Sequence, residues 1–212
     1  MNFDSLLQII GDDPVFESSL LLAGNVDPRY IRIQLARWIN SGRIYQLRRG
    51  LYSIAPPFQK SKPHPFLVAN RLQHSSYVSL QSALAYYGLI PETVNTTVSV
   101  TTGRPERLET PLGIFEFQHI KTNLLFGYQM TDLGDQEALV ATPEKALLDL
   151  VYFQSGGESA KYLHALRLQN LDRLNLDRLK KQTEVFASPK MRAATKNLLQ
   201  LIQDETGNFE EL

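Results

Sequence analysis

The chain has 212 residues, with 22 Lys/Arg balanced by 22 Asp/Glu, no cysteine and four isolated histidines. This composition excludes a disulfide framework and a thiolate metal site, and the spacing of the histidines argues against a zinc site, so we predict no metal and no cofactor. No apolar run approaches the roughly 20 residues that span a bilayer, and no signal-peptide pattern is present, so we expect a cytoplasmic protein without membrane contact.

The first part of the chain predicts three short helices. Capping residues followed by apolar residues at helical spacing predict a first helix that ends at Gly11. Residues 16–24 predict a second short helix. Asp27 and Pro28 are the residue types of a helix N-cap and a first helical turn, and they predict a third helix over residues 28–40.

The helix predicted over residues 28–40 has an apolar face and a basic face. The apolar residues that fall on one side are Ile31, Leu35, Trp38 and Ile39. The residues left facing outward or sideways are Arg29, Tyr30, Arg32, Ile33 and Arg37. In helix-turn-helix proteins the second helix of the motif lies in the major groove, and its N-terminal residues contact base edges. We therefore expect base contacts from Arg29, Tyr30 and Arg32. Arg37 is better placed for a phosphate, and the alternative for this face is an ordinary solvated one.

A β-hairpin is predicted next, because two β-rich runs, RIYQL and LYSI, flank Arg48-Arg49-Gly50. Three helices followed by a hairpin form the pattern of a winged helix. We therefore predict that residues 1–62 form a winged helix-turn-helix DNA-binding domain. Arg48 and Arg49, at the tip of its wing, are expected to contact the DNA backbone or a neighbouring minor groove. A plain exposed turn is the alternative.

Charge is segregated along the chain. Residues 28–91 contain nine Lys/Arg and no acid, whereas residues 1–27 contain five acids and no Lys/Arg. A block of positive charge in a neutral chain is typical of a surface that contacts a phosphate backbone. Further members of the block that we predict to contact DNA are Lys60, Lys62 and Arg71. For these three, a solvated cluster near a linker is the stronger alternative.

Residues 63–212 are expected to form a second, mixed domain beyond a proline-rich linker. The helices predicted in it span 66–72, 81–88 and 142–153, with two or three more within 158–204; the strands span 77–80, 96–101 and 114–120. The fold class expected for the whole chain is therefore α+β, an N-terminal winged helix-turn-helix followed by a mixed α/β domain with a small sheet and a C-terminal helical tail.

The second domain offers little catalytic chemistry. Lys145 and Asp149 are four residues apart on a predicted helix, which predicts an exposed ion pair and not an active site. A metal-dependent nuclease needs clustered carboxylates near a lysine, and the acids here are spread singly among strands and helices. We therefore expect that the protein is not an enzyme.

Five segments together resemble the AbiEi-type antitoxin family. They are LARWINSGRIYQLRRGLYSI (35–54), YVSLQSALAYYGLIPE (77–92), TTVSVTTGR (96–104), GIFEFQHI (113–120) and ATPEKALLDLVYF (141–153). The wing motif is found in many winged helices, and the resemblance depends on the serial order of all five. It covers roughly residues 14–155. Residues 92–212 carry 17 acids against 13 Lys/Arg, and so depart from the basic second domain common in the family.

The resemblance implies a bacterial type IV toxin–antitoxin system. Such a protein represses its own operon by binding inverted repeats in the promoter, as a dimer or as two monomers side by side on double-stranded DNA. It also counteracts a nucleotidyltransferase-like toxin without a stable direct complex, an activity associated with the C-terminal domain, here residues 63–212. Carried over to this sequence, the recognition-helix positions are Arg29, Tyr30, Arg32 and Arg37, and the wing positions are Arg48 and Arg49.

Other functions are compatible with the same sequence. A winged helix can bind an acidic protein partner, and a plain transcriptional regulator without a toxin uses the same DNA chemistry. A nuclease that uses the second domain is a further alternative, against which the scattered carboxylates argue.

Overall fold

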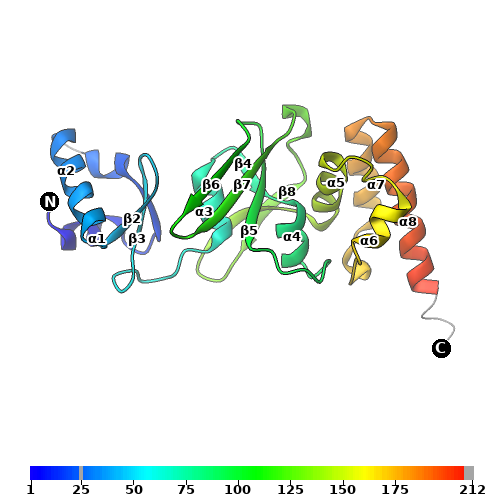
Figure 1. Cartoon of the computed structure of the whole chain (residues 1–212), viewed down its shortest axis with the longest axis horizontal. Coiled ribbons are helices and arrows are strands. Elements are labelled where there is room, and N and C mark those ends of the chain that lie inside the picture. Colours follow the sequence, from blue (N-terminus) through cyan, green and yellow to red (C-terminus); the bar gives the residue numbers. More distant parts are fainter. Residues whose placement is uncertain (24–25, 208–212) are drawn as a thin grey trace.

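The computed structural model describes residues 1–23 and 26–207. The molecule is elongated, with a small N-terminal unit, a central β-sheet and a group of C-terminal helices in a row (Figure 1). Within the described residues the chain forms eight α-helices and two sheets, of three and six strands. The α+β class predicted from the sequence is therefore confirmed. Gly24, the last residue of the second predicted helix, lies outside the described residues.

The N-terminal unit, residues 1–54, combines two α-helices with a three-stranded sheet. Its elements are α1 (Phe3–Ile10), β1 (Val15–Glu17), the 3₁₀ helix η1 (Ser18–Leu22), α2 (Pro28–Asn40), β2 (Ile44–Arg48) and β3 (Leu51–Ile54). The strand order is β1-β3-β2, and both pairs are antiparallel. Ten of the apolar side chains from these elements pack around Trp38 and form a core of their own, separate from the larger core of the rest of the chain: Phe3, Leu6, Ile10, Phe16, Leu21, Ile31, Leu35, Ile44, Tyr52 and Ile54.

The predicted helix over residues 16–24 is wrong for its first part, which is the strand β1. Phe16 pairs with Tyr52 of β3 in the antiparallel ladder, and the two rings stack with centroids 5.7 Å apart. Strand pairing with a distant segment outweighs weak local helix preference in so short a run. Residues 18–22 are helical, but as a single 3₁₀ stretch.

The third helix has the predicted bounds, and its ends follow from local chemistry. The Asp27 carboxylate accepts a hydrogen bond from the Arg29 backbone N–H at 2.8 Å, which caps the first turn of α2. After the helix ends, Gly42 adopts a φ of 68°, a left-handed conformation that glycine takes without a steric penalty. The chain then turns directly into β2.

The central sheet is mixed and lies between two groups of helices. Its elements are α3 (Pro65–Leu72), β4 (Ser76–Val78), α4 (Leu80–Tyr86), β5 (Thr96–Thr101), β6 (Glu106–Thr110), β7 (Gly113–His119), η2 (Thr122–Leu124), β8 (Tyr128–Asp132) and β9 (Glu137–Ala141). The strand order is β6-β7-β5-β4-β9-β8. The pairs β5–β7 and β4–β9 are parallel and the others are antiparallel. The three predicted strands are present, whereas β6, β8 and β9 were not predicted.

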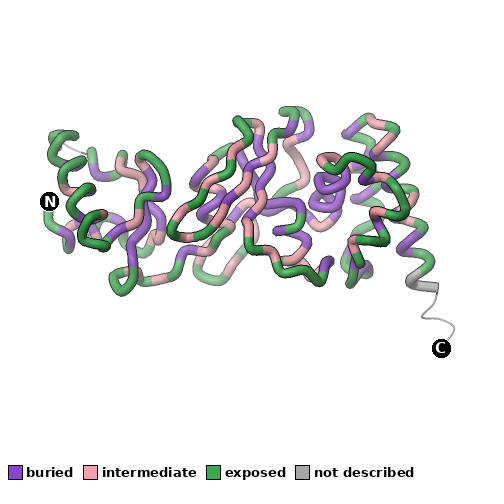
Figure 2. Tube along the Cα trace, in the orientation of Figure 1, coloured by how far each residue is buried: buried purple, intermediate pink, exposed green. Residues whose placement is uncertain are grey.

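The C-terminal helices complete the larger core. They are α5 (Pro143–Phe153), α6 (Ala160–Ala165), η3 (Leu171–Arg173), α7 (Leu176–Phe186) and α8 (Pro189–Gly207). Buried residues concentrate in the central strands and in α5, which lies between the sheet and the other C-terminal helices (Figures 1 and 2). Val15, Leu47 and Leu51 of the N-terminal unit also belong to this larger core, so the small sheet packs against it.

Candidate nucleic-acid interface

The outward face of α2 carries three arginines. Packing fixes its orientation, because Ile31, Leu35 and Trp38 on the opposite side are only 2%, 3% and 5% exposed. The residues that this packing leaves exposed are those predicted from the helical period: Arg29, Tyr30, Arg32, Ile33 and Arg37. The helix stands at one end of the molecule, away from the central sheet (Figure 1). Nothing in the chain therefore covers this face.

Tyr30 has a partner at the start of the chain. Its hydroxyl oxygen accepts a hydrogen bond from the Met1 ammonium group at 2.7 Å, while the side chain remains 41% exposed. The contact holds the first residue against the N-terminal turn of α2. It leaves the hydroxyl hydrogen of Tyr30 free to be donated to another group.

The two arginines of the β2–β3 turn differ in their surroundings. Gly50, with φ at 87°, allows the tight turn, and Arg49 before it is exposed. Arg48 instead extends toward the second part of the chain. Its guanidinium donates a hydrogen bond to the Leu72 carbonyl and lies 3.8 Å from the carboxylate of Glu106. Arg49 is thus available to a ligand, whereas Arg48 already has protein partners.

The acids of the N-terminal segment pair with cations of the basic segment. Lys60 Nζ lies 2.8 Å from Asp12 Oδ1 and holds the pKa of that carboxyl below its usual range. Arg71 and Asp13 approach to 3.0 Å. Glu17 lies 3.2 Å from His74 Nε2. The segregation of charge along the sequence is therefore partly cancelled in space, and Lys60 and Arg71 are not free cations.

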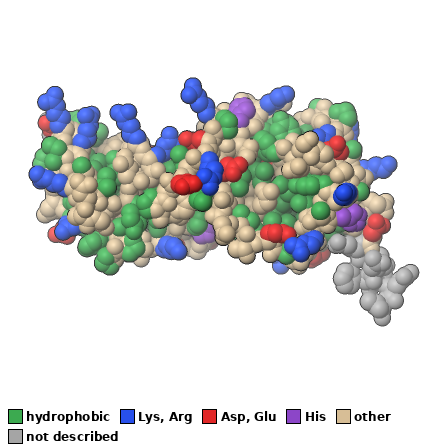
Figure 3. Space-filling view, in the orientation of Figure 1, with side chains coloured by type: hydrophobic (Ala, Val, Ile, Leu, Met, Phe, Trp, Pro, Cys, Tyr) green, Lys and Arg blue, Asp and Glu red, His purple; other side chains and the backbone are tan. Residues whose placement is uncertain are grey.

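Four exposed arginines remain on the N-terminal unit, at positions 29, 32, 37 and 49. Within the ranges that the structure describes, none of the four forms an ion pair. Lys62 is also exposed and unpaired among the described side chains. Lys and Arg side chains stand out along one edge of the N-terminal part (Figure 3). The positive surface is thus narrower than the sequence predicted, and α2 carries most of it.

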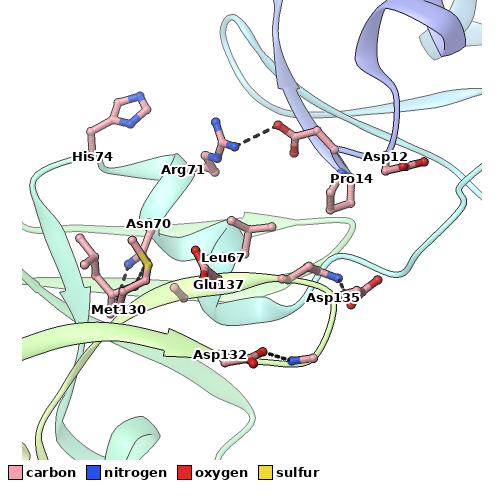
Figure 4. A pocket seen from close by; sticks show the side chains of 15 residues that line it. Asp12, Pro14, Leu67, Asn70, Arg71, His74, Met130, Asp132, Asp135 and Glu137 are labelled. Carbon is pink, nitrogen blue, oxygen red and sulfur yellow. Dashed lines mark hydrogen bonds and ion pairs between the residues drawn. The ribbon is translucent and has the colours of Figure 1, made fainter.

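A cavity of about 850 Å³ lies where the N-terminal unit meets β8 and β9. Figure 4 shows its walls, with Arg71 on one side and Glu137 on the other. Its lining includes five acids: Asp12, Asp13, Asp132, Asp135 and Glu137. Because this lining is acidic, the cavity repels a phosphate backbone and does not extend the arginine face.

A buried polar cluster in the second part was not predicted. Lys145 and Asp149 of α5, expected as an exposed ion pair, are paired with both side chains 0% exposed. Asp149 Oδ2 accepts hydrogen bonds from the hydroxyls of Tyr77 at 2.9 Å and Ser79 at 2.8 Å. The prediction was wrong because α5 is covered on both sides, whereas i,i+4 spacing alone does not reveal which face of a helix meets solvent.

Aromatic rings surround the buried ammonium group. Lys145 Nζ lies 4.9 Å from the ring centroid of Phe126 and 5.2 Å from those of Tyr77 and Phe186, and it donates to the Tyr77 hydroxyl at 2.7 Å. Burial raises the pKa of Asp149 and lowers that of Lys145, because desolvation disfavours both charged forms. A fully enclosed pair cannot reach a substrate, so we interpret this cluster as structural.

Comparison with known proteins adds no name to these features. No protein-family model matches the sequence, and a comparison with curated proteins gives no significant match. Among the described residues, no group of three or more His, Asp or Glu side chains is arranged to hold a metal ion. None of the described helices has the length and apolar character needed to cross a membrane.

Proposed function

We propose that the N-terminal unit is a winged helix that binds duplex DNA. In this proposal α2 enters the major groove and the β2–β3 turn contacts the backbone or the neighbouring minor groove. The observation that carries it is the outward face of α2, where Arg29, Arg32 and Arg37 are exposed and have no described acidic partner. A guanidinium group matches the paired acceptors of guanine and also binds phosphate.

The geometry of the first turn of α2 supports this orientation. Backbone N–H groups at a helix N-terminus carry a partial positive charge and bind phosphate readily. Arg29 and Arg32 lie in the first five residues of α2, so base contact and phosphate contact would occur at the same end of the helix. Arg49 on the wing would add a contact that does not depend on sequence.

The proposed biological role is autorepression coupled to antitoxin activity. One small unit contacts few base pairs, so two copies on inverted repeats of its own promoter are expected. The order of the five sequence segments shared with AbiEi-type antitoxins supports a type IV toxin–antitoxin role, with a separate nucleotidyltransferase-like toxin as the counteracted protein. The second part of the chain would carry the antitoxic activity, without a stable complex.

DNA binding is tested by gel shift with the full chain. The probe is the duplex upstream of the protein's own gene, and the control is an unrelated duplex of equal length. We expect tighter binding to the upstream duplex and a log–log salt dependence with a slope of about −0.9 for each neutralised phosphate. Equal, salt-insensitive binding to both duplexes would exclude the proposed interface.

The antitoxin role has a separate test in cells. The open reading frame next to the gene is expected to encode a nucleotidyltransferase-like protein that arrests growth when expressed alone. Co-expression of this chain should restore growth, and so should a version without α2 arginines, because the proposed antitoxic activity lies in residues 63–212. Growth arrest that persists with the intact chain would contradict the role while leaving DNA binding untouched.

A further inference from the structure

An isoleucine occupies the middle of the arginine face of α2. Ile33 is 52% exposed, although isoleucine is among the residue types most often buried. On the same helix Arg29 precedes it by four residues and Arg37 follows it by four. These spacings place the three side chains along one line of the helix surface, about 6 Å apart along the axis.

Packing within the chain does not account for the position of Ile33. The core of the N-terminal unit receives Ile31, Leu35 and Trp38 from α2, and Ile33 is not part of it. Contact between two copies through this face is also disfavoured. A two-fold interface pairs a surface with itself, so it would bring the α2 arginines of both copies together.

The major groove of DNA presents one apolar group, the C5 methyl of thymine. A side chain that contacts it must be apolar, exposed, and placed between groups that hold the helix in the groove. Ile33 meets these conditions, because Arg29 and Arg37 on either side can bind phosphates or guanine edges. Arg32, the adjacent residue on the outward surface, adds a further cation.

We propose that Ile33 is a specificity-determining residue that selects thymine through contact with its C5 methyl group. The inference rests on the proposed DNA binding and adds a base preference to it. The sequence bound by the protein would then contain at least one thymine whose methyl group contributes to affinity, near a guanine or a phosphate contacted by Arg29 or Arg32.

The experiment replaces thymine by deoxyuridine, which lacks only the methyl group. A duplex is first selected by the full-length protein from a randomised pool. Each thymine in it is then changed singly, and the Kd is measured by fluorescence anisotropy. We expect about a fourfold weaker Kd at one or two positions, the effect of removing one methyl-sized apolar contact.

Two variants connect the effect to the residue. In Ile33→Ala the difference between thymine and deoxyuridine should vanish at those positions. Ile9→Ala is the matched control, since Ile9 on α1 is 45% exposed and lies outside α2, and it should keep the wild-type difference. Thermal unfolding of both variants should match the wild type, because neither side chain is buried.

The outcomes are distinguishable. A thymine preference that disappears only in Ile33→Ala supports the inference. Selection of a specific duplex without any deoxyuridine effect, or with an effect that persists in Ile33→Ala, overturns the inference and leaves DNA binding intact. Failure to select any duplex overturns the proposed function, and the inference with it.

Discussion

Lys145 and Asp149 form an ion pair one turn apart on α5, with both side chains fully removed from solvent. The hydroxyl of Tyr77, from β4, hydrogen-bonds to both partners. The cluster therefore connects the central sheet to the helix that separates it from α7 and α8. Charges this deeply buried are tolerated only when every one of them is paired.

Removing one member of the pair should destabilise the fold strongly. Lys145→Met leaves Asp149 buried without a cation and should lower the free energy of unfolding by about 3–5 kcal/mol. Lys180→Met, at an exposed lysine of α7, is the control and should change it by less than about 0.5 kcal/mol. Urea unfolding measures both.

The pH dependence of Lys145→Met gives a second readout. Without its cation, the buried Asp149 carboxyl has a folded-state pKa raised above the unfolded value of about 4. A raised carboxyl pKa contributes stability that is present below the unfolded pKa and is lost as pH rises through the folded pKa. The deficit relative to wild type should thus be smaller near pH 4 than at pH 7. A deficit that does not depend on pH would show that the lost contacts were only apolar.

The arginines of the N-terminal unit should separate into base-reading and phosphate-binding groups. Arg32→Ala should cost about 1–3 kcal/mol of binding to the upstream duplex and relax its sequence preference. Arg49→Ala should weaken all duplexes similarly and reduce the salt slope by about 1. Gel shifts over a range of salt concentrations measure both effects.

Arg192→Ala is the matched control for these two variants. Arg192 is a half-exposed arginine of α8, at the far end of the molecule from α2 (Figure 1). Its loss should leave affinity and salt slope unchanged. If Arg32→Ala behaves like Arg192→Ala, the face of α2 is not the one that meets DNA.

The sequence predicted those elements whose signals are local. The bounds of α2 follow from the Asp27 cap, the proline after it and the glycine turn that ends it. The strand β5 follows from strict alternation in TTVSVT. The strand β1 was missed because only its pairing with β3, more than 30 residues away, makes it a strand. For β8 and β9, the alternation is too short to distinguish them from loops.

The same distinction applies to the candidate site. The exposure of Arg29, Arg32 and Arg37 follows from the helical period and was predictable. The pairing of Asp12 with Lys60 and of Asp13 with Arg71 joins residues 48 and 58 positions apart, so no local pattern contains it. Charge counted along the chain therefore overestimated the positive surface.

A histidine at the start of α3 predicts a pH-dependent stability. His64 Nδ1 accepts a hydrogen bond from the Phe66 backbone N–H at 3.1 Å and so caps the helix, which requires that nitrogen to be unprotonated. Burial lowers the pKa of His64. The unfolded chain therefore binds the proton more readily, and stability should fall as pH drops below about 6.5, the ordinary histidine value.

The variant His64→Asn isolates this contribution. Asparagine is a good N-cap and does not titrate, so the helix keeps its cap at every pH. The difference in unfolding free energy between wild type and variant should grow between pH 7 and pH 5, in favour of the variant. A constant difference over this range would mean that His64 protonation is not coupled to folding.

Gly127 tests how tightly the buried cluster is enclosed. It adopts a φ of 72°, and a Cβ added there would lie 3.1 Å from Cβ and Cγ of Lys145 and 2.8 Å from Gln182 Nε2. Gly42 has nearly the same φ, 68°, with no atom within 4 Å of an added Cβ. Gly42→Ala should thus cost about 1–2 kcal/mol, the backbone penalty alone. Gly127→Ala should cost a further 1–3 kcal/mol, roughly the effect of overpacking a core. The Gln182 amide can move aside, but the Lys145 stem is held by its ion pair and by the rings around it. Equal losses for the two variants in urea unfolding would mean that the cluster yields to an extra methyl group, and that its enclosure is looser than the contacts indicate.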